Sequence, residues 1–307
     1  MEFLLIGALL LSAIGTGSKQ YAMKKCGAIA PGAYNSIRIN MIRAAICLVI
    51  SFVIWLLTDG YGTNSLGLII SIAAGIGTAL NLFTWILSAQ RISLTLLEGV
   101  CTVGALVVPL FLAPYLYNGE SVSLLQWLGT FCVIASLFFF SEKDTKKMKS
   151  ASLLSGIALL FFCTFGIATA SVAKKLYTFY VAADDHGSVS FFTLVGFLTV
   201  FAVFLILLPI CRQNERRRIE KEEPSKPAPS LRAAWHFILI AAVALYASEF
   251  FATYASDLPS AIYYPAIKAL NVLGCFLLDV TVFKEKVTVK KAVGLVLLLA
   301  AVVLINV

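Results

Sequence analysis

Long apolar segments separated by short polar ones recur along almost the whole of this 307-residue chain, and they set the strongest limit on its fold. About 20 apolar residues suffice to cross the hydrocarbon core of a bilayer as an α-helix. Inside that core every backbone N–H and C=O must be paired within the protein, which helices achieve and irregular chain does not. The sequence therefore predicts an all-α integral membrane protein.

Composition agrees with this prediction. Apolar and aromatic residues make up 60% of the chain and charged residues 13%, whereas soluble domains contain roughly 45–50% and about 25%. Too few polar residues remain to cover a soluble core of this size. The seven cysteines stand singly in apolar segments, without a CxxC pair or partnered histidines. We therefore expect no disulfide framework, no metal site and no bound cofactor.

Charge clusters and turn residues divide the chain into ten expected spans. They lie near 3–22, 34–57, 66–88, 92–116, 123–140, 151–175, 188–211, 233–255, 258–282 and 288–307. Only the connections at 141–150 and 212–232 are long. The second reads RQNERRRIEKEEPSKPAPSLR, and its charge and proline content predict a disordered, solvated cytoplasmic loop.

The distribution of basic residues predicts the orientation. Lysine and arginine are concentrated in the connections after the odd-numbered spans, whereas the other side holds only Lys174 and Lys175 and several acidic residues. By the positive-inside rule the odd-numbered loops are cytoplasmic. We expect a multi-pass protein of the cell (plasma) membrane with both termini outside.

An internal repeat appears when the chain is laid on itself. An offset of 165 places Glu120 and Gly129 on Glu285 and Gly294, each pair followed by an apolar final helix. The two halves, 1–143 and 144–307, then hold five spans each. Because five is odd, the second half is inverted relative to the first. Inverted repeats are typical of secondary transporters, whose substrate site lies near the midplane between the halves.

The last fifty residues resemble the terminal hairpin of the drug/metabolite transporter superfamily, in particular its ten-helix EamA-like members. The resemblance rests on the Leu-Pro start at 258–259, the interruption at Pro265, the Phe-Lys-Glu-Lys turn at 283–286 and the helix around Gly294. In the number and order of its helices the whole chain resembles these transporters. It implies that spans 1–4 and 6–9 surround a central cavity, that spans 5 and 10 are peripheral, and that small organic solutes are transported. The long connection after span 7 and the outward termini depart from the family pattern.

Polar residues inside the spans mark the candidate site, because a charge in hydrocarbon is unfavourable by about 2.5 to more than 10 kcal/mol. In the ninth span Tyr264, Lys268, Asn271, Cys275 and Asp279 recur every three or four residues and so share one helix face. Asp279 has a second interpretation, as a cap for the end of that span. The predicted substrate-binding or coupling residues are Lys19, Arg38, Asn81, Trp85, Glu98, Glu249, Tyr264, Lys268 and Asn271.

The charged candidates admit more than one role. Glu98 and Lys268 either contact the solute or form a buried ion pair between the two central helices. Glu98 or Glu249 is a candidate for proton coupling, since burial favours the protonated carboxyl. Lys19, Arg38 and Lys268 are alternatively suited to grip a carboxylate or phosphate. Lys19 and Arg38 also lie where they can extend to the lipid head groups.

The fourth and ninth spans are both interrupted by proline. Pro109 and Pro114 lie in one, and Pro259 and Pro265 in the other. Proline removes a helical hydrogen bond and frees a carbonyl. Paired interruptions in corresponding helices indicate a transporter binding site.

These patterns predict a secondary active transporter, not an enzyme, that moves a small metabolite, amino acid, sugar or organic anion by alternating access. The transport is expected to be coupled to protons or to be an exchange of solutes. The expected partners are the solute and membrane lipid, not nucleic acid, and we expect a monomer or homodimer. A flippase for a lipid or lipid-linked sugar is the alternative. A lipid-modifying enzyme is disfavoured, because His186 and His236 lie beside no catalytic motif.

Overall fold

The computed structural model describes residues 2–58, 62–90, 92–116, 123–140, 150–182, 188–219, 231–284 and 286–306. Every regular element in these ranges is helical. The α-helices are α1 (Glu2–Ile29), α2 (Ala33–Thr58), α3 (Ser65–Ala89), α4 (Leu94–Leu116), α5 (Leu124–Phe140), α6 (Ser150–Tyr177), α7 (Val189–Ile219), α8 (Trp235–Ala255), α9 (Ser260–Thr281) and α10 (Val289–Asn306). A π-helical turn, Thr178–Ala182, extends α6, and a 3₁₀ turn, Leu231–Ala234, precedes α8.

Seven segments of the described chain are long and apolar enough to cross a bilayer. They are Ala33–Thr58, Ser65–Ala89, Leu94–Leu116, Gly156–Val181, Val189–Glu215, Leu231–Ala255 and Ile262–Thr281. Large apolar side chains cover the outside of the bundle: Leu57 is 77% exposed and Phe111 60%. Such a surface suits lipid and not water. The chain is a multi-pass helical membrane protein.

The helix bounds lie within a few residues of the expected spans except after spans 1 and 7. Helix α1 continues to Ile29, beyond the end expected at residue 22. After span 7 the chain also stays helical for longer than expected. There the disordered loop expected from residue 212 is wrong for 212–219, which continue α7 as regular helix. Residues 212–219 are mainly arginine, glutamate and glutamine. These are good helix formers, so they readily extend an apolar helix beyond the bilayer. The rest of that segment up to 230, and the connection at 141–149, lie outside the described residues.

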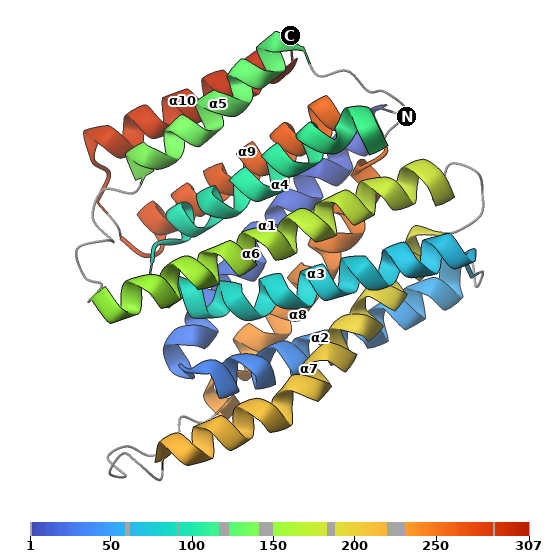
Figure 1. Cartoon of the computed structure of the whole chain (residues 1–307), viewed down its shortest axis with the longest axis vertical. Coiled ribbons are helices and arrows are strands. Elements are labelled where there is room, and N and C mark those ends of the chain that lie inside the picture. Colours follow the sequence, from blue (N-terminus) through green and yellow to red (C-terminus); the bar gives the residue numbers. More distant parts are fainter. Residues whose placement is uncertain are drawn as a thin grey trace.

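The helices lie side by side as a layered bundle (Figure 1). Helices α5 and α10 pack on one another at one edge, and α2 packs on α7 at the other. Between these edges α3 packs on α6, α1 on α8, and α4 on α9. The interior helices therefore include those on which sequence analysis placed most of the candidate site residues.

Two helix pairs approach closely through glycine. A Cβ atom added at Gly15 in α1 would lie 3.0 Å from Ala244 O and Ser248 N of α8. One added at Gly166 in α6 would lie 2.7 Å from Asn81 N of α3. Small residues allow membrane helices to pack backbone against backbone. These contacts position α1, α3, α6 and α8 around the centre of the bundle.

Asp279, at the end of α9, caps a different helix from the one expected. Its Oδ2 atom accepts hydrogen bonds from Thr95 N (2.9 Å) and Thr95 Oγ1 (2.5 Å) in the first turn of α4. Its Oδ1 atom lies 3.3 Å from Lys24 Nζ of α1. The prediction that Asp279 caps its own helix is wrong, because a carboxylate is favoured at the N–H groups of a helix start. One buried side chain thus joins α1, α4 and α9.

Candidate functional site

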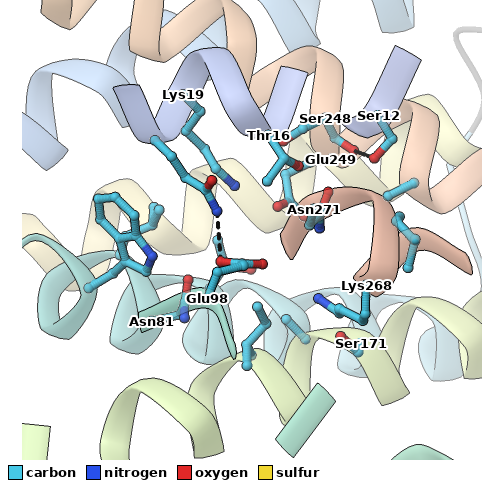
Figure 2. A pocket seen from close by; sticks show the side chains of 18 of the residues that line it. Ser12, Thr16, Lys19, Asn81, Glu98, Ser171, Ser248, Glu249, Lys268 and Asn271 are labelled. Carbon is cyan, nitrogen blue, oxygen red and sulfur yellow. Dashed lines mark hydrogen bonds between the residues drawn. The ribbon is translucent and has the colours of Figure 1, made fainter. Parts of the chain in front are cut away.

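A polar cavity of about 70 Å³ lies at the centre of the bundle (Figure 2). Helices α1, α2, α3, α4, α6, α8 and α9 supply its lining, and no described residue of α5 or α10 takes part. Its polar and charged lining residues are Ser12, Thr16, Lys19, Gln20, Arg43, Thr78, Asn81, Glu98, Ser171, Lys174, Ser248, Glu249, Lys268 and Asn271. A polar cavity of this size has room for a few water molecules or a small solute.

The polar face predicted for the ninth span is confirmed as an inward face of α9. Tyr264, Lys268 and Asn271 all line the cavity. Cys275, one turn further on, is fully buried, and its Sγ donates a hydrogen bond to Gln20 Oε1. The spacing of three and four residues puts these side chains on one side of the helix. Figure 2 shows Lys268 and Asn271 turned toward the same central space.

Glu98 of α4 is held by a residue that sequence analysis passed over. Gln20 Nε2 of α1 donates a hydrogen bond of 2.7 Å to Glu98 Oε2, drawn as a dashed line in Figure 2. The ion pair considered between Glu98 and Lys268 is not among the salt bridges of the described residues. Gln20 thereby links α1, α4 and α9 and fixes the orientation of the carboxylate.

Glu249 of α8 forms an ion pair with Lys174 Nζ of α6. Sequence analysis counted Lys174 among the basic residues of the outer side and not among the site residues, and the structure places it within α6, which continues to Tyr177. Along α6 the lining residues Ile167, Ser171 and Lys174 follow each other at helical spacing. The pair joins α6 to α8, two helices of the second half, and neutralises Glu249.

Arg43 of α2 is 1% exposed and also lines the cavity. Its Nη1 atom donates to Asn40 Oδ1 at 2.7 Å, and Asn40 Nδ2 donates to Leu82 O of α3 at 3.0 Å. Its Nε and Nη2 atoms have no hydrogen-bond partner among the described residues. A buried guanidinium with two nitrogen atoms that donate no hydrogen bond is unusual, because buried charges are normally paired.

Lys19 and Lys268 face the cavity from α1 and α9. Within the described part of the chain neither forms an ion pair or a hydrogen bond, and the charge of Glu98 acts on both. Asn271 Oδ1 is likewise buried and without a partner there. Among the described residues these three groups therefore have no hydrogen-bond or ion-pair partner.

The remaining candidates divide into two groups. Asn81 and Trp85 line the cavity, and Asn81 Nδ2 also donates to Cys163 O of α6 at 3.1 Å. Arg38, in contrast, is not among the lining residues. Its guanidinium lies 5.5 Å from the ring centre of Tyr34, within the first turns of α2. Eight of the nine predicted residues therefore meet at one site, and Arg38 lies apart from it.

The charges of the lining are unbalanced. Its cations are Lys19, Arg43, Lys174 and Lys268, and its carboxylates are Glu98 and Glu249, which leaves an excess of two positive charges. No group of three or more histidine, cysteine, aspartate or glutamate side chains placed to hold a metal ion occurs in the described residues.

Comparison with known proteins gives a fold and no family. No family model and no curated protein matches the chain. Solved structures do match it. One, described as "Crystal structure of protein", is 11% identical, covers 99% of this chain and 96% of its own, and superposes with a TM-score of 0.64. The arrangement of helices is thus shared with a known structure over nearly the whole length of both chains.

Proposed function

We propose that this protein is a secondary active transporter of ten membrane spans that carries a small organic solute across the plasma membrane by alternating access. The central polar cavity, built by both halves of the chain, is the observation that carries the proposal. Polar and charged groups at this depth are unfavourable in lipid and are typical of solute pathways. The resemblance of the last fifty residues to the terminal hairpin of the EamA-like transporters is the sequence feature that favours the same function.

The helix contacts support an inverted repeat of five and five spans. Helix α1 packs on α8 as α6 packs on α3, and α9 packs on α1 as α4 packs on α6. The pairs α2 with α7, α4 with α9, and α5 with α10 each join a helix to its own counterpart. Exchanging the two halves therefore leaves the main contacts in place, as a two-fold relation in the membrane plane requires.

Contacts on both sides of the cavity are suited to act as gates. At the end where α1 finishes, Asp279 binds Lys24 and Thr95. At the opposite end, where α6 finishes, Lys175 Nζ donates to Leu258 O at 2.8 Å. Opening the cavity to one side requires one of these sets to separate while the other holds. This is the two-state element that alternating access needs.

A lipid flippase is less well supported. Its substrate would enter through a lateral opening that joins the polar site to lipid. An apolar groove of about 540 Å³ between α3, α4 and α6 shares no lining residue with the polar cavity. The groove and the charged groups are therefore separate features.

Transport is tested with the purified full chain in liposomes. Labelled amino acids, sugars, nucleotides and organic anions are offered with and without a pH gradient, and a labelled phospholipid reports flippase activity. We expect uptake of one soluble class above protein-free liposomes. Glu98→Gln should slow it by roughly tenfold or more, because the loss of the charge alters both solute contact and the bond to Gln20. Asp257→Asn, an exposed carboxylate, is the control. Lipid movement alone, or no flux at all, would reject the proposal.

A further inference from the structure

We infer that the cavity binds a small organic anion whose oxyanion group, a carboxylate or a phosphate, lies between Lys19 of α1 and Lys268 of α9. The inference rests on the proposed function, because it names the chemical class of the transported solute. It begins from the charge balance of the lining, which has two cations more than it has carboxylates.

Both carboxylates already have protein partners. Glu249 pairs with Lys174, and Glu98 accepts from Gln20 at 2.7 Å. A cationic solute would have to displace these contacts and would meet Lys19 and Lys268 across the cavity. A neutral solute would leave both ammonium groups as they are. Only an anion gains from the groups that remain unsatisfied.

Lys268 is the strongest part of this case. It is 7% exposed, it lines the cavity, and no hydrogen bond or ion pair to it exists within the described residues. A buried charge without a partner is unfavourable, so a ligand of opposite charge is favoured there. Glu249 and Glu98 both act on the two lysines, but Glu249 is already paired with Lys174, and Glu98 supplies one further negative charge. An oxyanion between Lys19 and Lys268 would neutralise the positive charge that remains on them.

Two further unsatisfied groups, on Arg43 and Asn271, indicate which other functional groups the ligand carries. Arg43 is almost fully buried and has Nε and Nη2 free among the described residues, so it offers two more donors. Asn271 Oδ1 is an unpaired acceptor three residues beyond Lys268 on the same helix face. It calls for a hydroxyl or amino group on the solute. The lining thus fits a small hydroxy or amino derivative of a carboxylate or phosphate.

The size of the cavity limits the ligand further. A cavity of about 70 Å³ has room for several water molecules, and so for a small solute in this conformation. Trp85 and Tyr263 supply apolar walls. Short hydroxy acids, amino acids presented through their carboxylate, and small phosphate esters match the donors, the acceptor and the volume together.

The test uses pairs of probes that differ only in the oxyanion. Lactate is compared with 1,2-propanediol, and glycerol 3-phosphate with glycerol, with ethanolamine as the cation. Binding to the purified full chain is measured by the shift of its melting temperature and by uptake into liposomes. We expect an anion of one pair to bind and its neutral partner not to, and the responding pair separates carboxylate from phosphate.

Variants connect that binding to the lysines. Lys268→Gln should weaken binding roughly 10- to 100-fold, because a charge-assisted hydrogen bond is lost. Lys268→Arg keeps the charge and should retain more of the affinity. Lys286→Gln removes an exposed lysine and should behave as the unmodified chain. Asn271→Asp places a carboxylate beside Lys268 that competes with the ligand, so it should weaken binding as well, even if Lys268→Gln does not fold.

The outcomes separate the two proposals. If neutral or cationic probes bind and are transported while the anions are not, the anion assignment is overturned and the transporter function stands. Anion binding that is unchanged in both Lys268→Gln and Asn271→Asp also overturns it. If no class of solute binds or moves through a folded, monodisperse protein, the transporter function fails together with the inference.

Discussion

A single buried carboxylate, Asp279, determines how three helices meet at one end of the bundle. It is 1% exposed and binds Lys24 Nζ as well as the N and Oγ1 atoms of Thr95. Hydrogen bonds to a charged group are stronger than those between neutral groups, and a carboxylate at a helix start gains from the helix dipole as well. Asp279 therefore stabilises the start of α4, although it belongs to α9.

Replacing this carboxylate should destabilise the protein. Asp279→Asn removes the charge from Lys24 and weakens the cap on Thr95, so we expect a loss of about 1–3 kcal/mol. The melting temperature of the purified protein in detergent is the measurement. Asp257→Asn, on an exposed aspartate, should leave it unchanged. Equal melting temperatures for both variants would show that the buried contacts of Asp279 contribute nothing measurable.

At the scale of the helices, close glycine contacts decide how α1, α3, α6 and α8 surround the cavity. Gly15 lies against α8 and Gly166 against α3, and both glycines leave no room for a side chain. The polar groups on these helices meet at one site only because the backbones approach this closely. In lipid the hydrophobic effect does not drive helices together, so their packing depends on such close contacts.

A methyl group at one of these contacts should loosen the bundle. Gly166→Ala places its Cβ 2.7 Å from Asn81 N and Gly77 O, so α3 and α6 must move apart at about 1–3 kcal/mol. Gly7→Ala is the matched control, because nothing lies within 4 Å of its Cβ. Alanine also favours helix at both sites. Thermal unfolding should therefore show a lower melting temperature for Gly166→Ala alone, and a rise for both would contradict the contact.

For the whole molecule, the charge of the cavity affects the transport cycle. With the excess of two positive charges described above, the empty cavity is harder to enclose than the loaded one, because uncompensated charge is unfavourable away from water. We expect the solute exchange rate to exceed net efflux by roughly tenfold, which corresponds to about 1.4 kcal/mol. Efflux from preloaded liposomes with and without external solute measures this ratio. Equal rates would show that the empty carrier reorients freely.

The orientation of the molecule is a separate prediction. Figure 1 shows the start of α1 and the end of α10 toward the end of the bundle opposite the C-terminal end of α7. Because basic residues follow the odd-numbered helices, we expect the termini outside the cell. A reporter enzyme active only outside the cytoplasm, fused after residue 306, should be active, and the same reporter fused after Ile219 should be inactive. The reverse pattern would invert the proposed orientation.

Helical periodicity was enough to predict part of the site. The face of α9 that carries Tyr264, Lys268 and Asn271 follows from spacing, since residues three and four apart share a side of any helix. Glu98 and Glu249 were identifiable because a charge in an apolar span is unfavourable without a function. The residues that hold them, Gln20 and Lys174, were not identifiable. Their importance depends on which helices are neighbours.

Local hydropathy and turn residues are enough to predict that the chain is helical, that it is built for lipid, and where most of its helices begin and end. Tertiary structure alone decided that Asp279 caps α4, that Gln20 and not Lys268 is bonded to Glu98, and that Arg38 lies away from the cavity. Each of these contacts joins residues far apart along the chain, or depends on the angle at which a helix faces its neighbours. The balance of charge at the site is likewise a property of the assembled bundle, since the charged lining residues come from six helices.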